Sequence, residues 1–459
     1  MRAEPFRTAA LSASAVGIAA RRLSALVLGT LFALALGEAA DRGFWFVRAR
    51  LASARRGPGL FELYVIGEST AAGVPYDPRG GFPQIVSLLF DGRIHGRRIE
   101  IINIAHAGYT IYPQALAFSR LVSYRNPRNP GAVLIYSGHN DSFLWNQADR
   151  GRIAVGSSGF FRRSWLLSDI LLFAERAGVF KGLRSLGTYG ENMGWALDTA
   201  RDAGLIPVVS TVIGNVADIE PSLIIPPDKN WEEVRRLLAK GDSLEASGRA
   251  REAAAYYASL KASLPDTFLY LDYRRACCYR RLGEYDAARE LFWKVSDGDD
   301  YNFGHATRPQ NEFLRALAKE HSAFLVDAER IFEGRSAHGL VGAELIEDGQ
   351  HPNLRGYLLL AEGYARALSA AVGEPLRREG VSVESLPRLL SIGTREMIDA
   401  HLSSALASGR LPRPSPPAST AGAREEAFRG GAGARSGKPF GLAGSRARRG
   451  VRQEGRTHG

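Results

Sequence analysis

From residue 57 onward, short apolar runs alternate with longer amphipathic stretches. The apolar runs predict strands and the amphipathic stretches predict helices. We expect strands at 61–66, 99–104, 132–136, 205–213 and 323–326, and helices at 82–90, 113–124 and 189–203. This alternation is typical of a parallel sheet with helices on both faces. The sequence therefore predicts a three-layer α/β fold, in which ligands bind beyond the carboxyl ends of the strands.

A separate apolar run at 23–37 lies close to the amino terminus. Arg21 and Arg22 precede this run, and Glu38 and Asp41 follow it. The run is nearly long enough to span a bilayer, which predicts a membrane anchor at 23–40. The arginines before it favour a cytoplasmic position for residues 1–22. The rest of the chain would then lie in the periplasm or elsewhere outside the cytoplasm. A cleaved signal peptide is the main alternative, because small residues surround positions 39 and 40. A buried core helix is another.

The formal net charge of +11 comes from the two ends of the chain. Residues 1–56 hold nine arginines against three acidic residues, and residues 411–459 hold nine arginines and one lysine against three glutamates. The two ends thus carry net charges of +6 and +7, which leaves a net charge near −2 for the middle of the chain. A basic surface that binds nucleic acid is therefore not predicted for the folded part.

The cysteine content gives no sign of a disulfide framework or a metal site. Cys277 and Cys278 are adjacent within a predicted helix, so they cannot join distant segments of the chain and we expect them to be unpaired. A disulfide between the two neighbours, or a reactive thiol, is the alternative. No spacing of Cys and His residues fits a metal site. We expect neither a metal nor a cofactor.

Small and polar residues directly follow three predicted strands. Ser69 lies in a Gly-Glu-Ser-Thr sequence after the first strand, Gly108 lies in a turn after the second, and Asn140 follows the third. Asp348 and His351 occur three residues apart, before a predicted C-terminal helix. Each residue has a plain structural explanation: a serine there can cap a helix, and the others can occupy turns.

Together these residue types support nucleophilic catalysis. A serine hydroxyl needs a neighbouring imidazole to take its proton, and the imidazole needs a carboxylate to orient it. Ser69, His351 and Asp348 can fill these roles. The backbone N–H groups of Ser69 and Gly108 and the side-chain amide of Asn140 can then form an oxyanion hole. These five residues are the predicted catalytic set.

The order of these motifs resembles that of the SGNH (GDSL-like) hydrolases, whose four blocks contribute Ser, Gly, Asn and an Asp-x-x-His pair. Glu68 departs from the pattern, because the family often has Asp before the serine. The resemblance implies a flavodoxin-like fold and a serine esterase that acts through an acyl-enzyme on O-acyl or O-acetyl groups of envelope carbohydrate or lipid. Transfer of the acyl group to a sugar hydroxyl is an alternative, and an inactive envelope scaffold is another.

Three further residues flank the predicted catalytic set and are candidates for substrate binding. His106 and His139 lie beside the proposed oxyanion donors, and Asn215 follows the fourth predicted strand. The expected ligand is a small-molecule or carbohydrate ester.

The long interval between Asn140 and Asp348 contains an internal repeat. Gly248, Ala253 and Tyr257 recur as Gly283, Ala288 and Phe292, each pair 35 positions apart. This spacing resembles two tetratricopeptide-type helical hairpins at 230–297, which would divide the hydrolase core into 57–229 and 298–375. An ordinary helical hairpin is the alternative. Because two repeats are few for independent stability, we expect the insertion to pack on the core or on a protein partner.

The carboxyl-terminal part changes character near residue 410. Helical periodicity continues through 376–410. Residues 411–459 are rich in Gly, Ala, Ser, Pro and Arg and poor in large apolar residues, which predicts a disordered basic tail.

Overall fold

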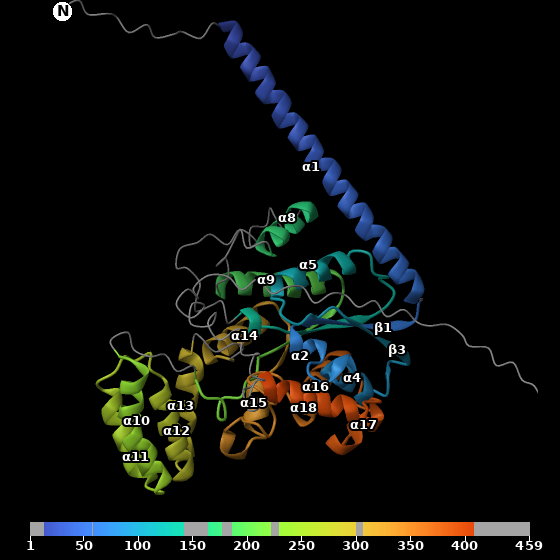
Figure 1. The fold of residues 1–459 in the computed structure, drawn as a ribbon. Helices are drawn as coiled ribbons and strands as arrows, with labels where there is room; N and C mark the ends of the chain where they lie inside the picture. Colours follow the sequence, from blue (N-terminus) through green and yellow to red (C-terminus); the bar gives the residue numbers. More distant parts are fainter. Residues whose placement is uncertain are drawn as a thin grey trace, which may run out of the picture. The chain divides into compact units, whose positions relative to one another are not determined.

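The computed structural model describes residues 13–56, 58–141, 164–176, 186–221, 229–299 and 306–407 (Figure 1). These residues all belong to a compact unit that ends at Leu411. The predicted tail at 411–459 and the first twelve residues of the predicted cytoplasmic segment lie outside the described residues.

A six-stranded sheet forms the centre of the fold and confirms the predicted α/β class. Its strand order is β2-β3-β1-β4-β5-β6, and every pairing is parallel except that of β2 with β3. The strands are β1 Leu60–Gly67, β2 Arg93–Ile94, β3 Arg97–Asn103, β4 Gly131–Tyr136, β5 Ile206–Ser210 and β6 Phe324–Val326. Without the short β2, this order is that of the flavodoxin-like sheet, whose ligand crevice lies between the first and third of its parallel strands. In this chain those strands are β1 and β4.

Helices cover both faces of the sheet (Figure 1). One face carries α4 (Phe82–Leu89) and α16 (Leu354–Val372), which pack against each other. The other face carries α5 (Ile111–Val122), α9 (Leu186–Asp202) and α14 (Arg308–Glu320). Burial on both sides explains why β1 and β4 are apolar along most of their length and fully buried.

The strand predicted at 205–213 is too long, because β5 ends at Ser210. Beyond it, the backbone N–H of Val212 donates to the side chain of Asn311, and that of Ile213 donates to the hydroxyl of Tyr136. The chain stays apolar and buried there because it crosses the core as a loop, and the side chains satisfy its backbone groups.

The amino-terminal helix α1 runs from Ala13 to Arg56 and extends far beyond the predicted anchor. Its segment Arg21–Arg48 is long and apolar enough to cross a membrane, by length and composition. The large side chains between Leu23 and Leu36 are exposed. From Gly37 onward α1 contacts α8 (Trp165–Arg176) and α5.

Four helices occupy the predicted insertion: α10 Trp231–Ala246, α11 Ala250–Lys261, α12 Tyr270–Arg281 and α13 Tyr285–Gly298. Asn230 begins α10 with a capping box in which its side chain accepts from Glu232 and Glu233 N–H groups. Position 241 requires glycine, because the Tyr257 ring occupies the space that a Cβ would fill. Assignment to the tetratricopeptide family stays a prediction.

The insertion packs on the α/β core, as its small size led us to expect. Phe292 and Tyr273 of the insertion share a buried apolar cluster with Ala217 and Leu340 of the core. The Arg280 guanidinium also forms an ion pair with Asp218 at 2.8 Å.

The remaining elements are short or lie near the carboxyl terminus. They are α2 Ser69–Ala72, α3 Asp77–Gly80, α15 Ala328–Glu333, α17 Leu386–Leu389 and α18 Thr394–Ala407, with 3-10 turns at Ala337–Gly339 and Val383–Ser385.

Candidate active site

Ser69 lies at the carboxyl end of the central strand β1, as the first residue of α2. The turn between strand and helix requires Gly67, because a Cβ there would lie 2.2 Å from the backbone oxygen of Tyr136. The Tyr357 hydroxyl of α16 donates to the backbone oxygen of Thr70 at 3.0 Å and supports the turn from the other side. Sheet and helix packing therefore fix the position of the serine.

Ser69, His351 and Asp348 form a continuous hydrogen-bonded chain. The Nε2 atom of His351 lies 2.7 Å from the Oγ atom of Ser69, and its Nδ1 atom lies 2.7 Å from Oδ2 of Asp348. The three side chains are largely buried. The structure thus brings together the three residues predicted as nucleophile, base and orienting carboxylate.

The loop that carries His351 is held by its own carboxylate. The Oδ1 atom of Asp348 accepts from the backbone N–H groups of Gln350 at 2.9 Å and His351 at 2.8 Å. Burial would raise the pKa of Asp348, but the hydrogen bond and charge of the His351 ring, with these two N–H groups, lower it below its ordinary value. Asp348 therefore stays ionised beside the imidazole.

Asn140 follows β4, the neighbour of β1, and points toward the loop that contains Gly108. Its Nδ2 atom donates to the backbone oxygen of Tyr109 at 2.8 Å. Gly108 has a φ of +78°, a conformation that favours glycine, and is exposed. The predicted oxyanion donors thus come from three loops at one edge of the sheet.

Glu68 holds the Asn140 loop in place. Its carboxyl oxygens accept from the Ser137 hydroxyl at 2.9 Å and from the backbone N–H groups of Gly138 and Asn140, each at 2.8 Å. Complete burial, and then the nearby charge of Asp141, raise the pKa of Glu68 to about 8, although these three hydrogen bonds oppose the increase. Glu68 therefore connects the turn that carries Ser69 to the loop that carries Asn140.

The three predicted substrate-binding residues occupy different surroundings. His106 is exposed, and its ring stacks on that of Tyr109 with centroids 4.0 Å apart. His139 is buried with its Nε2 atom 3.2 Å from the Tyr136 hydroxyl. Asn215 is fully buried, and its backbone N–H donates to the oxygen of Gly349 at 3.0 Å. His139 and Asn215 are therefore buried and His106 is exposed, and contact with substrate stays a prediction for all three.

Sequence reasoning missed three residues that shape the site. It treated Glu68 only as a departure from the family motif and did not single out Asp141 or Gln114. Asp141 accepts from the backbone N–H of Ile111 at 3.0 Å, which anchors the start of α5. The Oε1 atom of Gln114 accepts from the Gly67 N–H at 2.8 Å. The sequence did offer one sign for Glu68 and Asp141, because each is an acidic residue directly beside a predicted site residue.

Within the described ranges, no group of three or more His, Cys, Asp or Glu side chains is arranged to hold a metal ion. Cys277 and Cys278 are free thiols in α12, and burial raises the pKa of each.

No family model matches the chain, and no curated protein matches its sequence. Similar solved structures include TesA, at 15% identity and a TM-score of 0.30 over 67% of this chain and 98% of that chain. An acetyl xylan esterase from Geobacillus stearothermophilus matches at 15% identity and a TM-score of 0.34, over 70% of this chain and 99% of its own. A GDSL-like lipase from Bacteroides thetaiotaomicron matches at 12% identity and a TM-score of 0.34, over 71% of this chain and 98% of its own. Likenesses this remote do not assign a family.

Proposed function

We propose that the protein is a serine hydrolase that cleaves carboxylic esters through an acyl-enzyme. The observation that carries this proposal is the 2.7 Å contact between Ser69 Oγ and His351 Nε2, with Asp348 on the other nitrogen of the ring. A hydroxyl beside an oriented imidazole is the arrangement that activates serine for attack on a carbonyl.

In the first half of the reaction, the Ser69 hydroxyl attacks the ester carbonyl while His351 Nε2 accepts its proton. The negative charge that develops on the carbonyl oxygen is stabilised by the backbone N–H groups of Ser69 and Gly108 and by the Asn140 amide. A carboxamide nitrogen carries two hydrogens, so its bond to the Tyr109 oxygen leaves one for the substrate. The C–O bond then breaks, and His351 returns the proton to the departing alcohol.

In the second half, water attacks the acyl-enzyme while His351 accepts one of its protons. Collapse of the second tetrahedral intermediate returns that proton to Ser69 and releases the carboxylic acid. Asp348 keeps Nδ1 of the ring protonated throughout, so that Nε2 faces the serine as the base.

We further propose that α1 spans a membrane and holds the hydrolase outside the cytoplasm. The apolar side chains from Leu23 to Leu36 are exposed, and Arg21 and Arg22 lie at the amino-terminal end of the run. An apolar helix surface without protein cover favours lipid, and arginines favour the cytoplasmic side.

A fluorophosphonate probe tests the proposed chemistry, because it phosphonylates an activated serine. The full-length protein should be labelled at Ser69, Ser69→Ala should not be labelled, and the exposed-serine control Ser123→Ala should be labelled like wild type. Labelling that persists in Ser69→Ala, or a wild type that reacts with neither the probe nor a short aryl ester, would overturn the proposal.

A further inference from the structure

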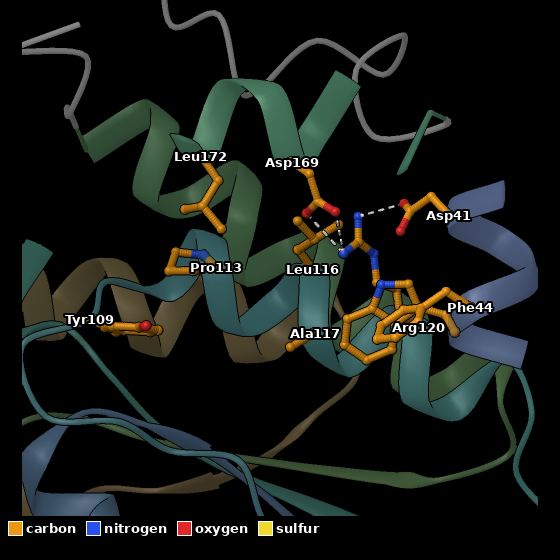
Figure 2. A pocket seen from close by; sticks show the side chains of 10 residues that line it. Asp41, Phe44, Tyr109, Pro113, Leu116, Ala117, Arg120, Asp169 and Leu172 are labelled. Carbon is orange, nitrogen blue, oxygen red and sulfur yellow. Dashed lines mark hydrogen bonds and ion pairs between the residues drawn. The ribbon is translucent and has the colours of Figure 1, made fainter. Parts of the chain in front are cut away.

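A cavity of about 290 Å³ lies where α1, α5 and α8 meet (Figure 2). Most of its lining is apolar, and the residues that matter most here are Phe44 and Trp45 of α1, Leu116 and Ala117 of α5 and Leu172 of α8. Its volume is at the lower end of small-molecule sites, which span about 300–1,000 Å³. The space therefore suits one hydrocarbon chain better than a whole lipid.

A polar cluster centred on Arg120 lies at one end of the cavity. The buried guanidinium of Arg120 donates to Asp169 at 2.9 Å and pairs with Asp41 at 3.5 Å, as the dashed lines in Figure 2 show. It also lies over the rings of Trp45 and Trp165, 5.1 and 5.3 Å from their centroids. Because its charge is already paired, this cluster does not call for an anionic ligand.

The opposite end of the cavity lies beside the loop that Asn140 contacts. Tyr109 lines the cavity at the end away from Arg120 (Figure 2). The same residue accepts the Asn140 amide on its backbone oxygen and stacks its ring on His106. The cavity and the proposed oxyanion loop therefore share a wall.

The cavity also lies beside the part of α1 that leaves the domain. Asp41, Phe44 and Trp45 follow the exposed apolar run by about one and a half to two and a half helical turns. On α8, Ile170 and Phe173 are also exposed apolar side chains. A lipid acyl chain that leaves the bilayer along α1 would reach the cavity before the rest of the domain.

We propose that this cavity binds an acyl chain of a membrane lipid ester, whose carbonyl is thereby presented to Ser69. This inference rests on the proposed function and names its substrate class. The lipid is the source that the position of the cavity beside the apolar run of α1 favours. A soluble acyl thioester is the other source of the same chain, and the experiment separates the two.

The first test fills the cavity. Ala117→Phe places a ring in the space, and Ser123→Phe, an exposed position at the end of the same helix, is the matched control. In nanodiscs, Ala117→Phe should lower kcat/KM for p-nitrophenyl dodecanoate about tenfold or more and change that for p-nitrophenyl acetate by less than about twofold, because hydrophobic pockets discriminate by about 10–200-fold per methylene. Ser123→Phe should behave like wild type for both esters.

The second test does not need turnover. Nanodiscs that contain a phosphatidylethanolamine with a diazirine near the methyl end of one acyl chain should, on irradiation, label the α5 peptide as well as α1. Ala117→Phe should lose the α5 label and keep the α1 label, which serves as the internal control.

The outcomes separate the two proposals. Two results would overturn the cavity inference and leave the hydrolase standing. In the first, the wild type cleaves the acetate but neither binds nor cleaves the long-chain ester. In the second, Ala117→Phe remains folded but loses activity on both esters equally. A wild type that cleaves neither ester but shows the Ala117-dependent α5 label overturns the hydrolase and leaves the cavity as a lipid-chain site. Labelling of α5 only by a soluble diazirine acyl thioester overturns the membrane source.

Discussion

A carboxyl oxygen of Glu68 accepts the backbone N–H of Asn140 at 2.8 Å, which joins the residue before the candidate nucleophile to the residue that carries the proposed oxyanion amide. Two further donors from the same loop, the Ser137 hydroxyl and the Gly138 N–H, reach this carboxyl group. One buried side chain therefore links the two loops that carry Ser69 and Asn140.

The buried Glu68 should make stability depend on pH in a specific direction. Because its pKa is raised from an ordinary value near 4.5 to about 8, the folded protein binds more protons than the unfolded chain between these values. The contribution of Glu68 to stability is therefore fully present below the lower value and is lost as pH rises through about 8. Urea unfolding at several pH values should show a steeper loss for wild type than for Glu68→Gln. Equal slopes would contradict the raised pKa.

The triad should behave as one unit. Ser69→Ala and His351→Ala should each remove most turnover of a short aryl ester, and the double variant should be little worse than either, because residues that act together are strongly non-additive. Asp348→Asn should lose a comparable or smaller factor, because the base survives in a poor orientation or tautomer. Losses that multiply would indicate independent roles.

Asn140→Ala should affect the rate more than binding. Removal of one oxyanion donor is expected to lower kcat by about 10²–10³ with a modest change in KM. Steady-state kinetics on the same ester measure both values. A large rise in KM with unchanged kcat would instead assign Asn140 to ground-state binding.

The start of α8 should depend on a residue of α1. The carboxylate of Glu38 accepts from the Trp165 N–H at 3.0 Å, the Leu166 N–H at 2.9 Å and the Ser164 hydroxyl at 2.8 Å. Glu38→Ala should cost about 1 kcal/mol at this helix end, as for other lost helix caps. Hydrogen exchange of the α8 amides should then quicken by about fivefold, with the β4 amides unchanged as the control. Unchanged α8 exchange would mean that Glu38 does not support the helix.

The orientation of the chain can be read with reporters. A periplasmic reporter enzyme fused after residue 60 should be active, because arginines precede the apolar run. The matched fusion to a reporter that works only in the cytoplasm should be silent. The reverse pattern would place the domain in the cytoplasm.

The sheet was predictable because a parallel strand buried on both faces is a short apolar run, and such runs are visible in the chain. Residues that follow neighbouring strands meet at one sheet edge, so the meeting of Ser69 with Asn140 followed from strand order. The approach of His351 needed the family resemblance, because 282 positions separate it from Ser69. The structure places these groups together, and their roles stay predictions.

Other features depend on tertiary contacts that leave no periodic trace. The sequence predicted a membrane segment but not that α1 continues to Arg56 and docks through Glu38 onto residues more than 120 positions away. The acceptor role of Glu68 was equally hidden, because which loop it meets depends on how the chain returns to the sheet. The end of β5 at Ser210 was missed because an apolar buried loop looks like a strand when read by hydrophobicity alone.

The docking of the domain on α1 sets the kinetic regime in which a tethered enzyme would work. The helix is continuous from its exposed apolar run to Arg56, and β1, which leads to Ser69, begins at Leu60. The stretch from Glu38 to Arg56 is about 27 Å long at about 1.5 Å per residue, and its first residue already binds the start of α8. A domain held directly beside the apolar run searches a thin layer next to the bilayer, so encounter with substrate would follow lateral diffusion and surface density rather than bulk concentration. Dilution of the vesicles would then leave the turnover of each anchored molecule unchanged, whereas dilution of substrate within the bilayer would lower it.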